Sequence, residues 1–163
     1  MEKRYPKDSI STSTKVVLPN DTNTVGNLFG GSLLAWIDEI AAVAAHRHSS
    51  SLVVTAAINN VSFSKPIDLG AIVTLCAKVS RAFGSSMEVI IDVFIEDRVT
   101  GEKSSSNQAI LTFVAMDRNG ATKKVPEIIP ETEEDKLLEE AAIEAKHFAK
   151  TLDSDFEEKL GWK

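Results

Sequence analysis

A helix predicted over residues 30–48 is the feature that most constrains the fold. Its apolar side chains recur every three or four residues and cover most of the helix circumference, at Leu33, Leu34, Ile37, Ile40, Ala41, Ala44 and Ala45. A helix that is apolar on most sides must be buried nearly all round. No second helical pattern follows between residues 49 and 130. We therefore expect β-structure to surround this helix.

The rest of the body has the pattern of short strands. Alternating or β-branched runs predict strands at residues 12–18, 52–63, 71–82, 87–96 and 104–116. Turn residues separate these runs, and connections this short favour antiparallel pairing because parallel strands need long crossovers. We therefore predict an α+β fold in which a curved antiparallel sheet wraps one long central helix. A chain of 163 residues suffices for one such core.

The two ends differ from this body. We predict a flexible N-terminus at residues 1–11, one folded domain at residues 12–128 and an acidic C-terminal helical extension at residues 129–163. Thr132 and Asp135 have the spacing of a helix cap. An apolar stripe follows at Leu138, Ala141, Ala142, Ala145, Phe148 and Leu152. Residues 127–163 hold 12 acidic and 5 basic residues, whereas residues 1–126 hold 12 and 13, so the negative charge belongs to the extension.

Composition disfavours several classes of function. The nearly neutral body has no long basic patch, so we expect no nucleic-acid partner. The longest apolar run, residues 40–45, is too short to span a membrane, and residues 1–11 lack the apolar segment of a secretory signal. The single Cys76 excludes an internal disulfide and a cysteine-cluster zinc site. His46 and His48 point to different sides of a helix, so we expect no metal site. These features predict a cytoplasmic protein.

Asp38 is the candidate catalytic residue on the predicted helix. It shares a face with Leu34, Ala41, Ala42 and Ala45. An unpaired carboxylate in an apolar setting costs several kcal/mol, so Asp38 needs an explanation. It either meets water, pairs with a base such as Arg47 or Lys65, or lines a cleft as a general base or nucleophile.

Gly30 and Gly31 stand where the predicted helix begins. Glycine lets a ligand approach the backbone closely, and the first N–H groups of a helix can stabilise an oxyanion. A plain turn at the helix start explains the pair equally well. The surrounding sequence matches neither the dinucleotide nor the P-loop fingerprint.

Several separated motifs together resemble the hotdog-fold acyl-CoA thioesterases, a family that includes the bacterial YciA-type enzymes and the cytosolic brain-type hydrolase. The motifs are PNDTNTVGNLFGG at residues 19–31, WIDE at 36–39, VVTA at 53–56, FSKP at 63–66, GSSME at 84–88, TFVA at 112–115 and PETEED at 130–135. They occur in the family's order and span about residues 12–140.

The resemblance implies a fold, an assembly and a set of site residues. It implies a dimer in which two sheets join, a trimer of such dimers, and active sites between subunits. Asn23, Asp38 and Thr55 match the family's catalytic positions, and backbone N–H groups near Gly30 and Gly31 would polarise the thioester carbonyl. Candidate contacts to coenzyme A are Lys65, Arg81, Gly84, Ser85 and Ser86. The reaction implied is metal-free hydrolysis of a fatty acyl-CoA without a cofactor, since coenzyme A is part of the substrate.

Other functions remain open from the sequence. A hotdog module that binds acyl-CoA without hydrolysing it is one alternative, and an oligomeric scaffold that binds a protein through its acidic tail is another. Asp38 could act as a general base or as a nucleophile. A dehydratase fits less well, because no Asp/His pair stands in the expected helix region.

Overall fold

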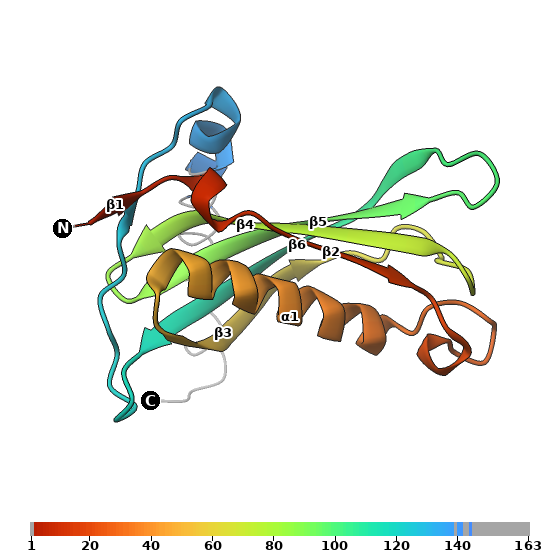
Figure 1. Cartoon of the computed structure of the whole chain (residues 1–163), viewed down its shortest axis with the longest axis horizontal. Coiled ribbons are helices and arrows are strands. Elements are labelled where there is room, and N and C mark those ends of the chain that lie inside the picture. Colours follow the sequence, from red (N-terminus) through yellow and green to blue (C-terminus); the bar gives the residue numbers. More distant parts are fainter. Residues whose placement is uncertain (1, 139, 142–143, 145–163) are drawn as a thin grey trace, which may run out of the picture. The chain divides into compact units, whose positions relative to one another are not determined.

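A five-stranded antiparallel sheet lies along one long helix in the computed structural model of the chain (Figure 1). The structure describes residues 2–138, 140–141 and 144. The helix is α1 (Gly30–Ser49). The strands are β2 (Ser11–Val16), β3 (Leu52–Val61), β4 (Ile72–Phe83), β5 (Ser86–Glu96) and β6 (Lys103–Met116), in the spatial order β2-β4-β5-β6-β3. The predicted α+β architecture is confirmed, and the element boundaries differ from the predicted ones by no more than two residues.

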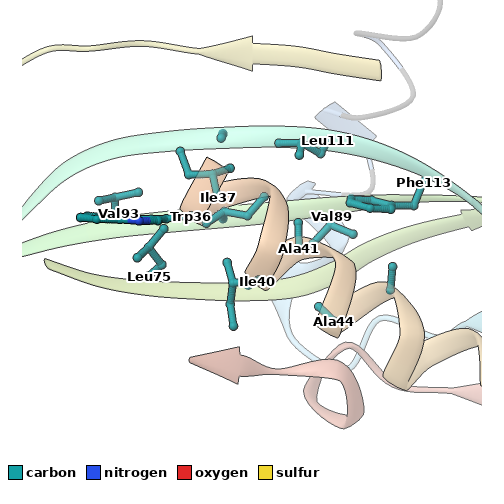
Figure 2. Close-up of a cluster of buried hydrophobic side chains, with 14 of the residues drawn as sticks. Trp36, Ile37, Ile40, Ala41, Ala44, Leu75, Val89, Val93, Leu111 and Phe113 are labelled. Carbon is teal, nitrogen blue, oxygen red and sulfur yellow. The ribbon is translucent and has the colours of Figure 1, made fainter. Parts of the chain in front are cut away.

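The core lies between α1 and the three central strands. Trp36, Ile37, Ile40, Ala41 and Ala44 pack against Leu75 of β4, Val89 and Val93 of β5, and Leu111 and Phe113 of β6 (Figure 2). The alanines are fully buried, because a side chain that small lets the helix backbone approach the sheet closely. They are therefore core residues of a single chain.

One face of α1 remains uncovered, which differs from the prediction of burial nearly all round. Gly31, Ala35 and Val43 are exposed, and Asp38 is half-buried on the same side. The reason is geometric, since a sheet of five strands covers only part of the helix circumference. This open face carries Asp38 and borders the edge strand β3.

The segment predicted as a flexible N-terminus instead contains two short elements. β1 (Lys3–Arg4) pairs in parallel with β7 (Glu127–Ile128), and a 3-10 turn, η1 (Pro6–Ser9), follows it. The Arg4 guanidinium donates hydrogen bonds to the carbonyl oxygens of Arg47 at 2.6 Å and His48 at 2.8 Å. These carbonyls belong to the last turn of α1, where the helix offers them no N–H donors of its own, so the segment caps the helix.

His48 joins the same end of α1 to the start of β7. Its ring is fully buried, and Nε2 donates to the carbonyl oxygen of Pro126 at 2.9 Å. Burial lowers the pKa of His48 from its ordinary value, and the hydrogen bond to Pro126 opposes this lowering only in part. The charges that also act on it come from Arg4, Asp8 and Glu2.

We predict an acid-sensitive contribution of His48 to stability. The unfolded chain takes up a proton at His48 as the pH falls through about 6.5, whereas the folded chain resists it, so stability is present above that pH and declines below it. Replacing His48 with Gln keeps a donor for Pro126 without the titration. The loss of Tm between about pH 7.5 and pH 5.5 should therefore be smaller in His48→Gln than in the wild type. Exposed His46, replaced likewise, is the control; equal losses in all three proteins would contradict the prediction.

The chain divides at residue 130 into two compact units, Met1–Ile129 and Pro130–Lys163. In the second unit the predicted cap is confirmed. The Asp135 carboxylate accepts hydrogen bonds from the N–H groups of Glu131 and Thr132, and the Asp135 N–H donates to the Thr132 hydroxyl. Residues 133–138 are helical. The stripe positions Ala142, Ala145, Phe148 and Leu152 lie outside the described residues.

Candidate functional site

The loop before α1 is folded around the side chain of Asn23. Its Oδ1 accepts hydrogen bonds from the backbone N–H groups of Val25 and Asn27, both at 3.1 Å. The Asn23 N–H donates to the Asn27 carbonyl at 2.8 Å, which closes the loop. Asn and Asp favour such turns because their side-chain oxygen reaches N–H groups a few residues ahead. The amide nitrogen of Asn23 donates to no acceptor among the described residues.

A cavity of about 210 Å³ opens beside this loop at the N-terminal end of α1. It brings together three of the residues predicted from the sequence, namely Asn23, Gly30 and Lys65. Its full lining is Asn23, Asn27, Leu28, Gly30, Leu33, Phe63, Lys65, Pro66, Ile67 and Asn107. Backbone hydrogen bonds from Leu28 N–H to Ile67 O at 2.7 Å and from Leu69 N–H to Gly26 O at 3.3 Å tie its two walls together.

The glycine pair begins α1 as predicted. No side chain caps this end of the helix, and the first N–H groups of any α-helix lack an acceptor within it. Aromatic rings lie against both glycines. A Cβ on Gly31 would come within 2.7 Å of the Phe29 ring, whereas one on Gly30 would lie 3.5 Å from Phe63. At Gly31 a side chain would therefore displace Phe29, which gives this glycine a packing role beside its exposed N–H.

Asp38 and Thr55 meet on the open face of α1. The Thr55 hydroxyl donates to Oδ1 of Asp38 at 2.7 Å. The register of β3 against β6 shifts directly after Thr55, where Ala56 is an extra residue in the ladder. Bulges of this kind redirect neighbouring side chains and are common beside active sites. Neither basic residue considered from the sequence pairs with Asp38, because Arg47 donates to Ile10 O and Ser11 Oγ and Lys65 lies at the cavity.

The Asn23 cavity and the Asp38–Thr55 pair are separate places within one chain. Gly30 borders the cavity, and Asp38 follows it by eight residues, or about 12 Å along an α-helix. Asp38 does not line the cavity. The structure thus presents the three predicted catalytic residues as two groups, Asn23 at the cavity and Asp38 with Thr55 farther along α1.

The remaining predicted contacts lie on the hairpin between β4 and β5. The Arg81 guanidinium stacks on the Phe83 ring at 3.7 Å. The carbonyl oxygens of Gly84 and Ser85 accept hydrogen bonds from the N–H groups of Val125 and Ala115. Ala115 pairs with Val53 at the start of β3, so this hairpin lies towards the C-terminal end of α1 (Figure 1). Within one chain the structure therefore does not bring Lys65 together with Arg81 and residues 84–86.

Sequence reasoning selected neither Phe63 nor Asn107 among the residues that line the cavity. Phe63 covers Gly30, and Asn107 reaches the lining from β6. The FSKP motif pointed to the region of Phe63, but no local pattern marks Asn107, because its neighbours in the cavity are about 40 or more residues away in sequence. Within the described part of the chain, no group of three His, Cys, Asp or Glu side chains could hold a metal ion, and no helix is long and apolar enough to cross a membrane.

Residues 25–102 match the model of the thioesterase superfamily. The chain is 42% identical over 143 residues to the acyl-CoA thioester hydrolase YkhA of Bacillus subtilis, an alignment that covers 88% of this chain and 83% of the other. A solved variant of an acyl-CoA hydrolase from Staphylococcus aureus, with one asparagine replaced by alanine and coenzyme A bound, superposes with a TM-score of 0.91 at 34% identity; the match covers 99% of this chain and 96% of the other. A hexameric acyl-CoA thioesterase superposes with a TM-score of 0.90 at 39% identity over 94% and 98% of the two chains.

The Staphylococcus aureus hydrolase has been solved in several further forms. One carries butyryl coenzyme A. Variants of it replace an asparagine, an aspartate and a threonine, one at a time, by alanine. In that chain the aspartate follows the asparagine by 15 residues, and the threonine follows the aspartate by 17.

Proposed function

The chain belongs to the hotdog-fold family of acyl-CoA thioesterases, and we propose that it hydrolyses fatty acyl-CoA to free fatty acid and coenzyme A at a site shared by two subunits. The observation that carries the proposal is the 2.7 Å hydrogen bond from Thr55 to the half-buried Asp38 on the open face of α1. The positions of Asn23, Asp38 and Thr55 also support it, since they are separated by the same 15 and 17 residues as the three residues replaced in the Staphylococcus aureus hydrolase.

Asp38 is the group that we assign to proton transfer. Thr55 occupies one carboxylate oxygen as a donor, which orients the carboxylate and leaves the other oxygen to accept a proton from water. The water oxygen then bonds to the thioester carbon, the carbon–sulfur bond breaks, and the departing thiolate takes up a proton. Attack by Asp38 itself would form an anhydride that water hydrolyses, with the same products.

The start of α1 and Asn23 complete the proposed site. The thioester oxygen gains negative charge as the carbonyl carbon is attacked, and donors preorganised for that charge lower the barrier. The open N–H groups of Gly30 and Gly31 at the positive end of the helix dipole are suited to this role. The free amide nitrogen of Asn23 would orient the water or the substrate. Coenzyme A would contact Lys65 on one subunit and Arg81 with residues 84–86 on the other.

The separation of the two groups within one chain supports an interface site. In a two-fold symmetric pair joined at β3, the two α1 helices run antiparallel, so the N-terminal end of one meets the later turns of the other. The edge strand β3 suits this pairing because Leu52, Val54 and Ile58 are exposed on it. We propose a homo-oligomer, and a trimer of such dimers as its full form, with a cytoplasmic location.

The test is a thiol-release assay with DTNB on acetyl- to palmitoyl-CoA. We expect release of coenzyme A with at least one chain length, and the profile would define the acyl preference. A correctly assembled protein that binds coenzyme A in calorimetry but hydrolyses none of these substrates would contradict the proposal. That outcome would favour a non-catalytic acyl-CoA-binding module.

A further inference from the structure

A polar cluster, buried on its β6 side, stands where the connection after β3 passes β6. Its members are the backbone of Ser62, the side chain of Ser64, and Ser106 with Asn107 on β6. Only 8% of Ser106 and 4% of Asn107 is exposed. The β6 ladder is irregular here, because Ser106 is an extra residue between the pairs formed by Ser105 and Asn107. A bulge leaves backbone groups without ladder partners, so these groups need other hydrogen bonds.

Asn107 and Ser64 supply them. With the Asn107 amide turned so that its nitrogen faces the neighbouring oxygens, this nitrogen donates to the carbonyl oxygens of Ser62 at 3.0 Å and Ser106 at 2.7 Å, and it lies 3.2 Å from Ser64 Oγ. The Ser64 hydroxyl donates to the Ser106 carbonyl at 2.5 Å. Two residues of the connection are thereby fixed to β6 on either side of Phe63.

The fixed residues are neighbours of two that line the cavity. Phe63 lies between Ser62 and Ser64 and packs on Gly30, and Lys65 follows Ser64. Asn107 lines the same cavity from β6. Phe63 and Lys65 are both exposed, so packing restrains their side chains only weakly. Their position therefore depends mainly on the backbone of residues 62–66.

We infer that Asn107 is a positioning residue for acyl-CoA binding: it fixes residues 62–66 so that Phe63 and Lys65 face the substrate. This inference rests on the proposed function of the cavity. A core amide that serves stability alone would change Tm but not substrate affinity in the assembled protein. A positioning residue changes KM through Lys65, because the ammonium group then no longer stands where the substrate needs it.

The experiment compares Asn107→Ala, Lys65→Ala and the double variant in steady-state hydrolysis and in calorimetric titration with coenzyme A. We expect Asn107→Ala to raise KM about tenfold with kcat within about twofold of wild type. In the Lys65→Ala background, Asn107→Ala should raise KM by less than a further factor of about two, because the two residues act as a unit. Gln108→Ala is the matched control, since Gln108 is the next residue, is exposed, and donates to Asp92 at 2.8 Å.

The outcomes distinguish a positioning role of Asn107 from a purely structural one. An unchanged KM in Asn107→Ala, or a full further increase in the double variant, would overturn the inference. If Asn107→Ala does not assemble, Ser64→Ala removes one hydroxyl of the same cluster and should raise KM about threefold. If the wild type binds coenzyme A without hydrolysing acyl-CoA, the proposed function fails. The role of Asn107 is then tested by the Kd for coenzyme A, which should rise in Asn107→Ala as KM was expected to. A wild type that binds neither coenzyme A nor acyl-CoA would overturn both the proposed function and the role of Asn107.

Discussion

Replacing Asp38 with Asn is expected to lower kcat for acyl-CoA hydrolysis by about a thousandfold, the range that a positioned general base contributes. Asn has nearly the same shape and keeps an oxygen for the Thr55 hydroxyl, but it can neither accept a proton from water nor attack a thioester. The Kd for coenzyme A should stay within about threefold of the wild-type value, because the change removes chemistry rather than binding. Steady-state hydrolysis and calorimetry measure the two quantities.

Two matched variants make this result interpretable. Glu39 is the next residue on α1 and its exposed carboxylate pairs with Lys15 at 3.2 Å. Glu39→Gln removes the same charge one residue away, and we expect kcat to be unchanged. Thr55→Val removes only the hydrogen bond to Asp38 and should lower kcat about tenfold. If Asp38→Asn retained wild-type kcat, the assignment of Asp38 to proton transfer would be wrong.

Combining two inactive subunits is expected to restore activity. In a dimer of one Asn23→Ala subunit and one Asp38→Asn subunit, one site loses both residues and the other keeps both. Random assembly makes half of the dimers mixed, so about a quarter of all sites should be intact. Co-expression with two different tags, followed by purification on both, enriches mixed oligomers for the assay.

The control pair tests which residues come from the same chain. Asp38 and Thr55 contact each other within one subunit, so co-expressing Asp38→Asn with Thr55→Val should give no more activity than Thr55→Val permits. If the Asn23→Ala and Asp38→Asn pair, shown to be mixed, stayed inactive, then Asn23 and Asp38 would act within one chain. The proposed interface site would then be wrong.

The sequence predicted the helix and the strands because their signals are local. Periodicity and turn residues set the bounds of α1 and of β2 to β6 within two residues. The N-terminal elements were missed because their partners are remote. Two residues of β1 form a strand only against Glu127 and Ile128, and nothing in the segment around Lys3 announces that pairing.

The residues of the candidate site could be predicted where they lie in a motif of the family. Asn23, Asp38 and Thr55 were identified by resemblance, and the structure adds the hydrogen bond that joins two of them. Spacing alone left Asp38 with three explanations. The positioning role that we infer for Asn107 could not be predicted from the sequence, because it depends on a bulge and a crossing connection that exist only in three dimensions.

In the proposed site, one atom of the Asn23 side chain serves folding and another serves the reaction. Its oxygen holds the loop together through two backbone N–H groups, whereas its nitrogen is free to meet a ligand. Aspartate offers the same oxygen and no donor. Selection for abundance alone would therefore accept either residue at position 23, and only selection for turnover distinguishes them.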